Sequence, residues 1–331
     1  MNPYTFPEII GQDEVKRQIN SALLSGRNMV LVGPPGIGKT TLAKSIAATL
    51  PDLELNDCEF HCDPKHPVCP ECKTKKTKTK KVKGVDRFVR VQGSPDLTVE
   101  DLLGDIDPVK ALQFGPLSLE AFTPGKIFKA NHGVLFFDEL NRCPEKLQNA
   151  LLQVLEEKKA TIGSYDVDFP ANFLFISTMN PEDFTGTEKL SEVLLDRFDM
   201  VYMHYPENAA MEESIILTKG KKLGVEFPKT LLMHMVAFTR SLREHKDLER
   251  FPSVRATLGL YERAQANAVL EEKSEVTLHH IQQAMISVLI HRLRLKPSVR
   301  YTKTAEQFIK ESFEEYCQDH NLSVHERGDV G

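Results

Sequence analysis

The sequence lacks the features of a membrane or secreted protein. Its apolar runs, such as VLFF at residues 134–137, are far shorter than the 18 or so residues that a membrane-spanning helix requires. The first ten residues, MNPYTFPEII, contain neither a charged start nor an apolar run, so no secretory leader is predicted. We therefore expect a cytoplasmic protein without a membrane span.

A strong excess of charge of one sign is also absent. The formal net charge of -5 excludes a generally basic nucleic-acid-binding protein. Any basic surface must be local, and the clearest candidate is residues 73–83, where seven lysines lie close together. This segment contains no aromatic residue that could stack on bases, and a lysine run is usually a solvated loop.

What the sequence does contain, at residues 29–41, is MVLVGPPGIGKTT, the pattern of a phosphate-binding loop between a strand and a helix. An apolar run ends at Val32, and a helical pattern follows the glycines. The glycines let backbone N–H groups and a positive helix end face phosphate oxygens together. Lys39 supplies a point charge, and Thr40 offers a hydroxyl for Mg²⁺. The predicted nucleotide-binding residues here are Gly33, Pro34, Pro35, Gly36, Ile37, Gly38, Lys39, Thr40 and Thr41.

Two further apolar runs end in polar residues suited to the same chemistry. HGVLFFDELNR places Asp138 and Glu139 after a strand, where an acid can hold Mg²⁺ and an adjacent glutamate can deprotonate the attacking water. NFLFISTMN ends in Asn180, which can position that water, although a turn residue before Pro181 is the simpler interpretation from position alone. An acidic pair after a strand is weak evidence by itself, but it becomes strong beside the phosphate-binding loop.

With these Walker A and Walker B motifs the chain resembles the AAA+ ATPases over nearly its whole length. PEIIGQDEVKRQI resembles the family's opening segment and implies that Ile10 and Gly11 lie near the adenine. SEVLLDRFDM resembles the arginine-finger segment and implies that Arg197 contacts the γ-phosphate of a neighbouring subunit. FPSVRAT resembles the sensor-2 segment and nominates Arg255. The forked N–H donors of an arginine side chain match the oxygens of a phosphate, and its charge is permanent. If the family resemblance were ignored, a surface salt bridge would be the favoured role for either residue.

Within AAA+ proteins the chain is most similar to the ATPase subunit of magnesium chelatase and to the MoxR family. DLLGDIDPVKALQFGP, FTPGKIFKANHGVLFFDELN and VLIHRLRLKPS resemble chelatase segments, whereas NRCPEKLQ is closer to MoxR proteins. The resemblance implies an α/β fold: an AAA+ P-loop core with a parallel sheet between helices at residues 1–205, and a C-terminal helical lid at 206–331. It also implies a pore-lining hairpin around Gly163 and an insertion near residues 100–122.

The resemblance also implies a function. We expect a Mg-dependent ATPase that forms a homo-oligomeric ring, as a hexamer, and couples ATP hydrolysis to remodelling of a partner protein or to metal insertion. A partner with a von Willebrand factor A domain is typical of this family. A nucleic-acid-dependent, helicase-like motor is the less favoured alternative, because related AAA+ helicases share the hairpin and the lysines can follow a phosphate backbone.

A cluster of four of the six cysteines lies in an insertion at about residues 56–85. The sequence is not that of a secreted disulfide framework, and in a reducing compartment such a cluster favours metal or redox chemistry. Zinc bound by four sulfurs, a reversible disulfide and inert thiols all fit, and His61 or His66 could replace one sulfur. The candidate zinc ligands, spaced C-x₃-C-x₆-C-x₂-C, are Cys58, Cys62, Cys69 and Cys72.

Overall fold

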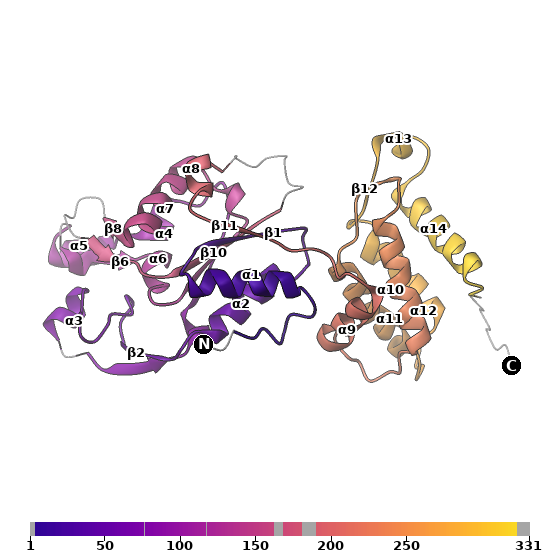
Figure 1. Cartoon of the computed structure of the whole chain (residues 1–331), viewed down its shortest axis with the longest axis horizontal. Coiled ribbons are helices and arrows are strands. Elements are labelled where there is room, and N and C mark those ends of the chain that lie inside the picture. The colour runs from indigo at the N-terminus through magenta and orange to yellow at the C-terminus, as the bar shows by residue number, and fades with distance from the viewer. Residues whose placement is uncertain (1–3, 76, 117, 162–167, 181–189, 323–331) are drawn as a thin grey trace. The chain divides into compact units, whose positions relative to one another are not determined.

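The computed structural model describes residues 4–75, 77–116, 118–161, 168–180 and 190–322 (Figure 1). A first compact unit ends at Met203 and a second begins at His204, and residues 35–37 group with the second unit. Each unit has a hydrophobic core of its own. None of the helices in the described ranges has the length and apolar character needed to cross a membrane.

The first unit is built on a five-stranded parallel sheet, as the sequence predicts. The strand order is β11-β1-β10-β7-β4, and every neighbouring pair is parallel. Strand β1 is buried along its whole length, which explains why it reads as a continuous apolar run and not as an alternating one. The strands in chain order are β1 (Met29–Val32), β4 (Phe88–Gln92), β7 (Val134–Asp138), β10 (Leu174–Met179) and β11 (Asp199–Tyr202).

Helices accompany this sheet, and the three longest of them bury an apolar face each. In α7 the buried side chains of Leu147, Leu151 and Val154 recur at helical spacing, so one stripe of the helix faces the core. The α-helices are α1 (Asp13–Leu24), α2 (Lys39–Thr49), α4 (Val99–Leu103), α5 (Pro108–Phe114), α6 (Lys126–Lys129), α7 (Glu145–Glu157) and α8 (Glu192–Leu195). Short 3₁₀ turns lie at η1 (Gly84–Arg87), η2 (Leu119–Ala121) and η3 (Leu140–Arg142).

Three small antiparallel pairs stand apart from the central sheet. Strands β2 (Leu53–Asn56) and β3 (Thr79–Val82) enclose the cysteine segment and α3 (Pro70–Thr74). Strands β5 (Gly104–Ile106) and β6 (Phe122–Pro124) enclose α5. Strands β8 (Lys159–Thr161) and β9 (Asp168–Pro170) form the arms of the expected hairpin, whereas its tip, with Gly163, lies outside the described residues.

The second unit is helical, as predicted, with one departure. The sequence shows no strand signal after residue 206, yet β12 (Leu248–Arg250) and β13 (Arg294–Leu295) pair with each other. Strands of two or three residues are too short to show an alternating pattern, so periodicity cannot reveal them. The helices are α9 (Ala209–Lys219), α10 (Lys229–Arg243), α11 (Val254–Leu270), α12 (Leu278–Leu289), α13 (Pro297–Arg300) and α14 (Ala305–Asp319). Helix α14 packs on this unit through Phe308, Ile309, Phe313 and Cys317.

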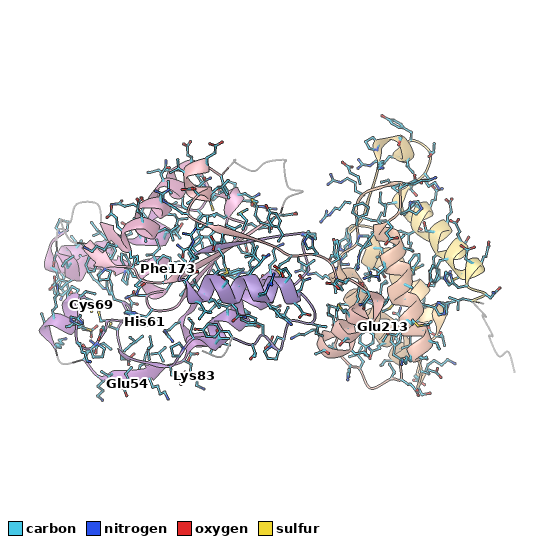
Figure 2. The ribbon with its side chains drawn as sticks, viewed as in Figure 1. Glu54, His61, Cys69, Lys83, Phe173 and Glu213 are labelled. Atoms are coloured by element: carbon cyan, nitrogen blue, oxygen red, sulfur yellow. The ribbon has the colours of Figure 1, made fainter. Side chains whose placement is uncertain are left out.

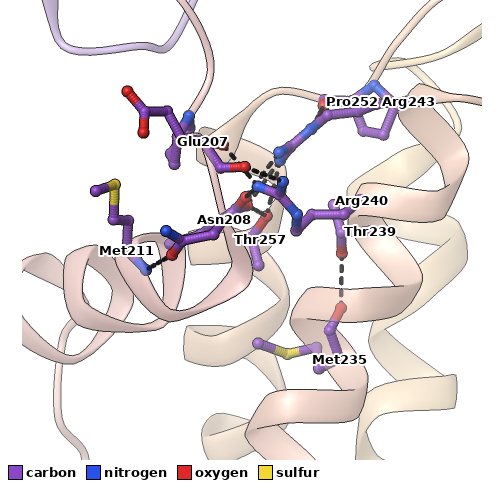
Figure 3. Close-up of polar contacts among 11 residues, drawn as sticks. Glu207, Asn208, Met211, Met235, Thr239, Arg240, Arg243, Pro252 and Thr257 are labelled. Atoms are coloured by element: carbon purple, nitrogen blue, oxygen red, sulfur yellow. Dashed lines mark hydrogen bonds and ion pairs between the residues drawn. The ribbon is translucent and has the colours of Figure 1, made fainter. Parts of the chain in front are cut away.

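A buried carboxylate joins three helices of the second unit (Figure 3). Glu212 on α9 is fully buried and accepts two hydrogen bonds of 2.7 Å from Arg243 on α10 and one of 2.6 Å from Thr257 on α11. Burial raises the pKa of Glu212, but the hydrogen bonds and charges of Arg243 outweigh it, so the pKa is below its usual value. Arg243 also donates to the carbonyl oxygen of Pro252, at 2.8 Å, just before α11.

Candidate active site

The carboxyl ends of three neighbouring strands bring the predicted nucleotide residues to one edge of the sheet. Val32 at the end of β1 lies opposite Met179 at the end of β10, so the next residues along are Gly33 and Asn180. The amide of Gly33 donates to the carbonyl oxygen of Met179 at 3.2 Å. Strand β7 lies on the other side of β10 and ends at Asp138. Ligands of open parallel sheets bind at this edge.

The loop between β1 and α2 has the backbone shape that its glycines permit. Gly36 and Gly38 have φ angles of 79° and 98°, which side chains other than glycine rarely adopt. Helix α2 begins immediately after Gly38, so its first N–H groups point out of its amino end. The Lys39 ammonium donates to the carbonyl oxygens of Gly33, at 2.6 Å, and Pro34, at 2.9 Å. The loop therefore offers amide donors and a positive charge, the groups that a triphosphate requires.

The Asp138 carboxylate is held by two donors. The Thr178 hydroxyl donates to its Oδ1 at 2.7 Å, and Arg90 on β4 lies 2.6 Å from its Oδ2. Its side chain retains only 15% exposure, so little of the carboxylate faces solvent. Thr40 is partly exposed in the first turn of α2, which contacts β7. A hydroxyl and a carboxylate on these two elements are oxygen ligands of the kind that Mg²⁺ takes.

Glu139 follows Asp138 in a strained backbone conformation. Its φ and ψ angles of 59° and 55° are left-handed, an uncommon state for a side chain of this size. The Thr178 hydroxyl oxygen accepts the amide of Glu139 at 2.9 Å, so one threonine orients both acids. The Glu139 carboxylate accepts a hydrogen bond of 3.0 Å from Gln92 and pairs with Arg142 at 3.2 Å. Strain of this kind persists where the surroundings fix the residue, and it is often found at functional sites.

Sequence reasoning missed four residues of this edge. Gly93 donates its amide to the carbonyl oxygen of Asp138 at 2.6 Å, and a β-carbon on it would overlap the backbone of Glu139. Polar residues interrupt the apolar run FVRVQG and end the run FLFIST, and this pattern is the sequence signal for these four residues. The four residues are Arg90, Gln92, Gly93 and Thr178.

The remaining predicted residues come from other elements. Gly11 has a φ angle of 66° and, with Ile10, precedes α1. Arg197, after α8, pairs with Glu156 on α7 at 2.8 Å and donates to the carbonyl oxygen of Val193 at 2.6 Å. Arg255 lies in the first turn of α11, in the second unit. A β-carbon on Gly36 would lie 3.2 Å from that of Arg255, so α11 begins beside this part of the loop.

The four clustered cysteines also come together, away from the phosphate-binding loop. Their Sγ atoms all lie within 4.8 Å of one another. All six cysteines are free thiols, and Cys62, Cys69 and Cys72 are buried. A hydrogen bond between two of these thiols lowers the pKa of Cys62 and raises that of Cys58. The cluster contains sulfur only: His66 is exposed and pairs with Asp63.

Comparisons with known families agree with this geometry. The model described as "ATPase family associated with various cellular activities (AAA)" matches residues 64–200, and that of the AAA lid domain matches residues 240–312. The chain is an AAA+ ATPase. The model of magnesium chelatase, subunit ChlI, matches residues 5–80 of this ATPase. The predicted α/β core with a helical lid and the expected ATP-hydrolysing activity are thereby confirmed.

Individual relatives point in the same direction. The magnesium-chelatase subunit ChlI homolog of Methanocaldococcus jannaschii is 25% identical, over 89% of this chain and 86% of its own. The magnesium-chelatase 38 kDa subunit of Acidiphilium rubrum is 27% identical, over 89% and 92%. A solved complex between magnesium-chelatase subunits BchI and BchD is similar in fold, with 22% identity, 91% and 99% coverage and a TM-score of 0.50.

Proposed function

We propose that this AAA+ ATPase is a Mg-dependent motor of the magnesium chelatase and MoxR type, which forms a hexameric ring and uses hydrolysis to remodel a partner protein or to drive metal insertion. The observation that supports it best is the shared edge of β1, β10 and β7, with the phosphate-binding loop, Asn180 and the two acids. The similarity to chelatase subunits over most of the chain supports the type of motor.

Each residue of the shared edge has a distinct role in this proposal. The amides of the loop and the Lys39 ammonium bind the β- and γ-phosphates. Thr40 and Asp138 would hold Mg²⁺, which neutralises the charge of these phosphates. Thr178 and Arg90 keep the Asp138 carboxylate aimed at that position.

The chemical step is assigned to Glu139 and Asn180. Glu139 accepts a proton from water as that water attacks the γ-phosphorus, and the bond to the bridging oxygen of ADP breaks. Gln92 and Arg142 hold the carboxylate before reaction, which limits its rotamers. Asn180, at the end of the strand between β1 and β7, orients the same water. Ile10 and Gly11 contact the adenine.

Two arginines complete the site in this proposal. Arg197 acts on the γ-phosphate held by the neighbouring subunit of the ring, and Arg255 acts as the sensor-2 residue. Their permanent charge and forked donors suit a phosphate whose charge shifts during transfer. Arg197 pairs with an exposed carboxylate, Glu156, and an exposed ion pair is weak enough to exchange for a phosphate.

A partner protein belongs to this function. The similar solved structure is of a complex between two different chelatase subunits, which supports a partner for this chain too. We propose a partner with a von Willebrand factor A domain. We also propose that the protein is cytoplasmic, because its clustered cysteines favour metal or redox chemistry in a reducing compartment.

The experiment compares two kinds of stimulation. The ATPase rate of the purified chain is measured in the presence of Mg²⁺ under three conditions: without an addition, with a candidate von Willebrand factor A partner, and with single-stranded DNA. Mass photometry follows the assembly of the chain. We expect nucleotide-dependent rings and a several-fold stimulation by the partner only. Stimulation by DNA and not by the partner would overturn the proposal in favour of a nucleic-acid motor.

A second cofactor is part of the proposal. The nucleotide chemistry uses none of the four clustered cysteines, and four thiolates are the ligand set of a structural zinc site. We assign one zinc ion to them, outside the nucleotide site.

A further inference from the structure

The cysteine cluster is connected to a part of the molecule that the nucleotide chemistry does not explain. We infer that the zinc-bound segment 58–72 braces the root of the β8–β9 hairpin, through Phe60 and Asn131, so that the metal fixes the position of this hairpin. This inference rests on the zinc ion of the proposed function and adds its role.

The geometry of the cluster is close to that of a tetrahedral site. Four sulfurs at about 2.3 Å from one zinc ion lie about 3.8 Å apart, and the four Sγ atoms here are all within 4.8 Å of one another. Cys69 caps the amino end of α3, where its sulfur accepts the amide of Cys72 at 3.4 Å, so a helix turn aims two of the ligands. The sulfur of Cys58 accepts the amide of Cys62 in the same way, at 3.4 Å.

Phe60 lies between the first two of these cysteines and enters an aromatic cluster. Its ring centroid is 5.3 Å from that of Phe169 on β9, 5.5 Å from Phe128 on α6 and 6.3 Å from Phe122 on β6. Phe169 also contacts Phe122, at 6.2 Å, and Phe128, at 5.7 Å. Ring pairs at these separations attract each other beyond the effect of the area that they bury. The residue fixed by Cys58 and Cys62 therefore contacts one arm of the hairpin directly.

A buried asparagine makes a second connection. The amide nitrogen of Asn131 donates to the carbonyl oxygen of Phe60 at 3.3 Å, and its side-chain oxygen accepts the backbone amide of Asn172 at 3.0 Å. Asn131 is only 3% exposed, and its hydrogen bond to Phe60 is buried, whereas that from Asn172 is partly buried. Asn172 lies between β9 and β10. Segment 58–72 therefore contacts both β9, one arm of the hairpin, and the connection between β9 and β10.

These contacts predict which regions respond to the metal. Figure 2 places Cys69 and His61 at the end of the first unit where Figure 1 shows β6 and β8. Strand β1 and helix α2 do not take part in the aromatic cluster. Loss of zinc is therefore expected to loosen β8, β9 and β6 while nucleotide still binds at Lys39.

The first measurement is the metal content of the full chain, purified without a histidine tag. We expect about one zinc per chain in the wild type and in a Cys317→Ala control, which removes a buried thiol outside the cluster, and less than a tenth in Cys69→Ser/Cys72→Ser. Thiol titration and mass analysis accompany it. Iron in place of zinc, a disulfide within the cluster, or zinc unchanged by the double substitution would overturn the metal site.

The second measurement separates bracing from metal binding. Amide exchange at residues 159–161, 168, 169 and 171 is compared in the wild type, the chelated wild type, Phe60→Leu and Phe88→Leu. The last substitution alters a ring stacked on Phe136, outside the cluster. We expect exchange at least tenfold faster after chelation and in Phe60→Leu, which keeps its zinc, and no change in Phe88→Leu. Unchanged exchange without zinc would overturn the bracing role.

A third measurement relates the inference to the nucleotide site. Binding of a fluorescent ATP analogue is measured with and without zinc. We expect the affinity to change less than twofold. Loss of binding together with the metal would overturn the inference, because the insertion would then belong to the core of the motor. Zinc content is read independently of hydrolysis, so a failed ATPase proposal would be distinguished from a failed metal site.

Discussion

A β-carbon at Gly93 would lie 2.1 Å from the carbonyl oxygen of Glu139, so only glycine fits beside this acid. Gly93 follows the last residue of β4, and its amide donates to Asp138, the residue before Glu139. The left-handed backbone of Glu139 therefore requires a residue without a side chain at position 93. The position of the proposed general base depends on both residues.

Gly93→Ala is expected to lower ATP hydrolysis by about 10²-fold, because a displacement of about 1 Å at a catalytic group costs that much. Nucleotide affinity should stay within a few-fold of the wild type. The control is Gly133→Ala, whose β-carbon would lie 2.0 Å from the carbonyl oxygen of Arg87, before β7 and away from the acids. Steady-state ATPase rates of both variants are measured at a temperature where both are folded. Equal losses of ATPase rate in the two variants would contradict the prediction.

Lys39→Ala and Glu139→Gln are expected to fail in different ways. Removing the Lys39 charge weakens nucleotide binding, because the charge acts on the bound phosphates before reaction. Glu139→Gln should bind normally and hydrolyse about 10²- to 10⁴-fold more slowly, because it loses the base. Equilibrium binding and single-turnover hydrolysis separate the two effects. Near-normal turnover by Glu139→Gln would remove this residue from its assigned role.

Arg197→Ala is expected to be about 10³-fold slower than the wild type by analogy with arginine fingers of other nucleotide hydrolases. Mixed with Glu139→Gln, it should regain activity, because one interface of a mixed ring then contains an intact site. Glu156→Gln is the matched control, since it removes the partner of Arg197 within the subunit and leaves the finger. No recovery on mixing, at concentrations where rings form, would leave action across subunits unsupported.

The buried Glu212 predicts a pH-dependent stability of the lid. Because its folded-state pKa lies below the usual value of 4.5, its stabilisation is present above about pH 4.5 and is lost as the pH falls through the lower, folded-state value. Glu212→Gln should lower the free energy of unfolding by about 3 kcal/mol at pH 7, because it leaves Arg243 buried without a counter-charge.

The control for this variant is Glu213→Gln, which changes the next, partly exposed residue (Figure 2). Denaturant melts of the full chain between pH 3 and pH 7 should show the gap between wild type and Glu212→Gln closing on acidification. A gap that is the same at every pH would contradict the assignment.

The fold, and the position of much of the candidate site, could be predicted from the sequence because these features depend on local pattern. A run of buried apolar residues followed by Gly33 to Thr40 indicates a strand, a turn and a helix without reference to the rest of the chain. The pairing of β4 with β7 is not local, so the contacts of Gln92 and Gly93 with Glu139 could not be read from spacing. The cysteine spacing indicated a cluster, but the contacts of Phe60 with Phe169, more than a hundred residues later, come only from the tertiary structure.

The pairing of β2 with β3 has a further consequence for engineering. Leu53 lies opposite Val82, so the chain leaves for the cysteine segment and returns at nearly the same place, and neither strand belongs to the central sheet. Joining the two ends by a short turn would close a much smaller loop, and loop-closure cost changes only slowly with length. Another small module with adjacent ends can therefore be grafted at residues 53–82 while the register of the motor's sheet is kept, provided that it supplies the ring contacts of Phe60.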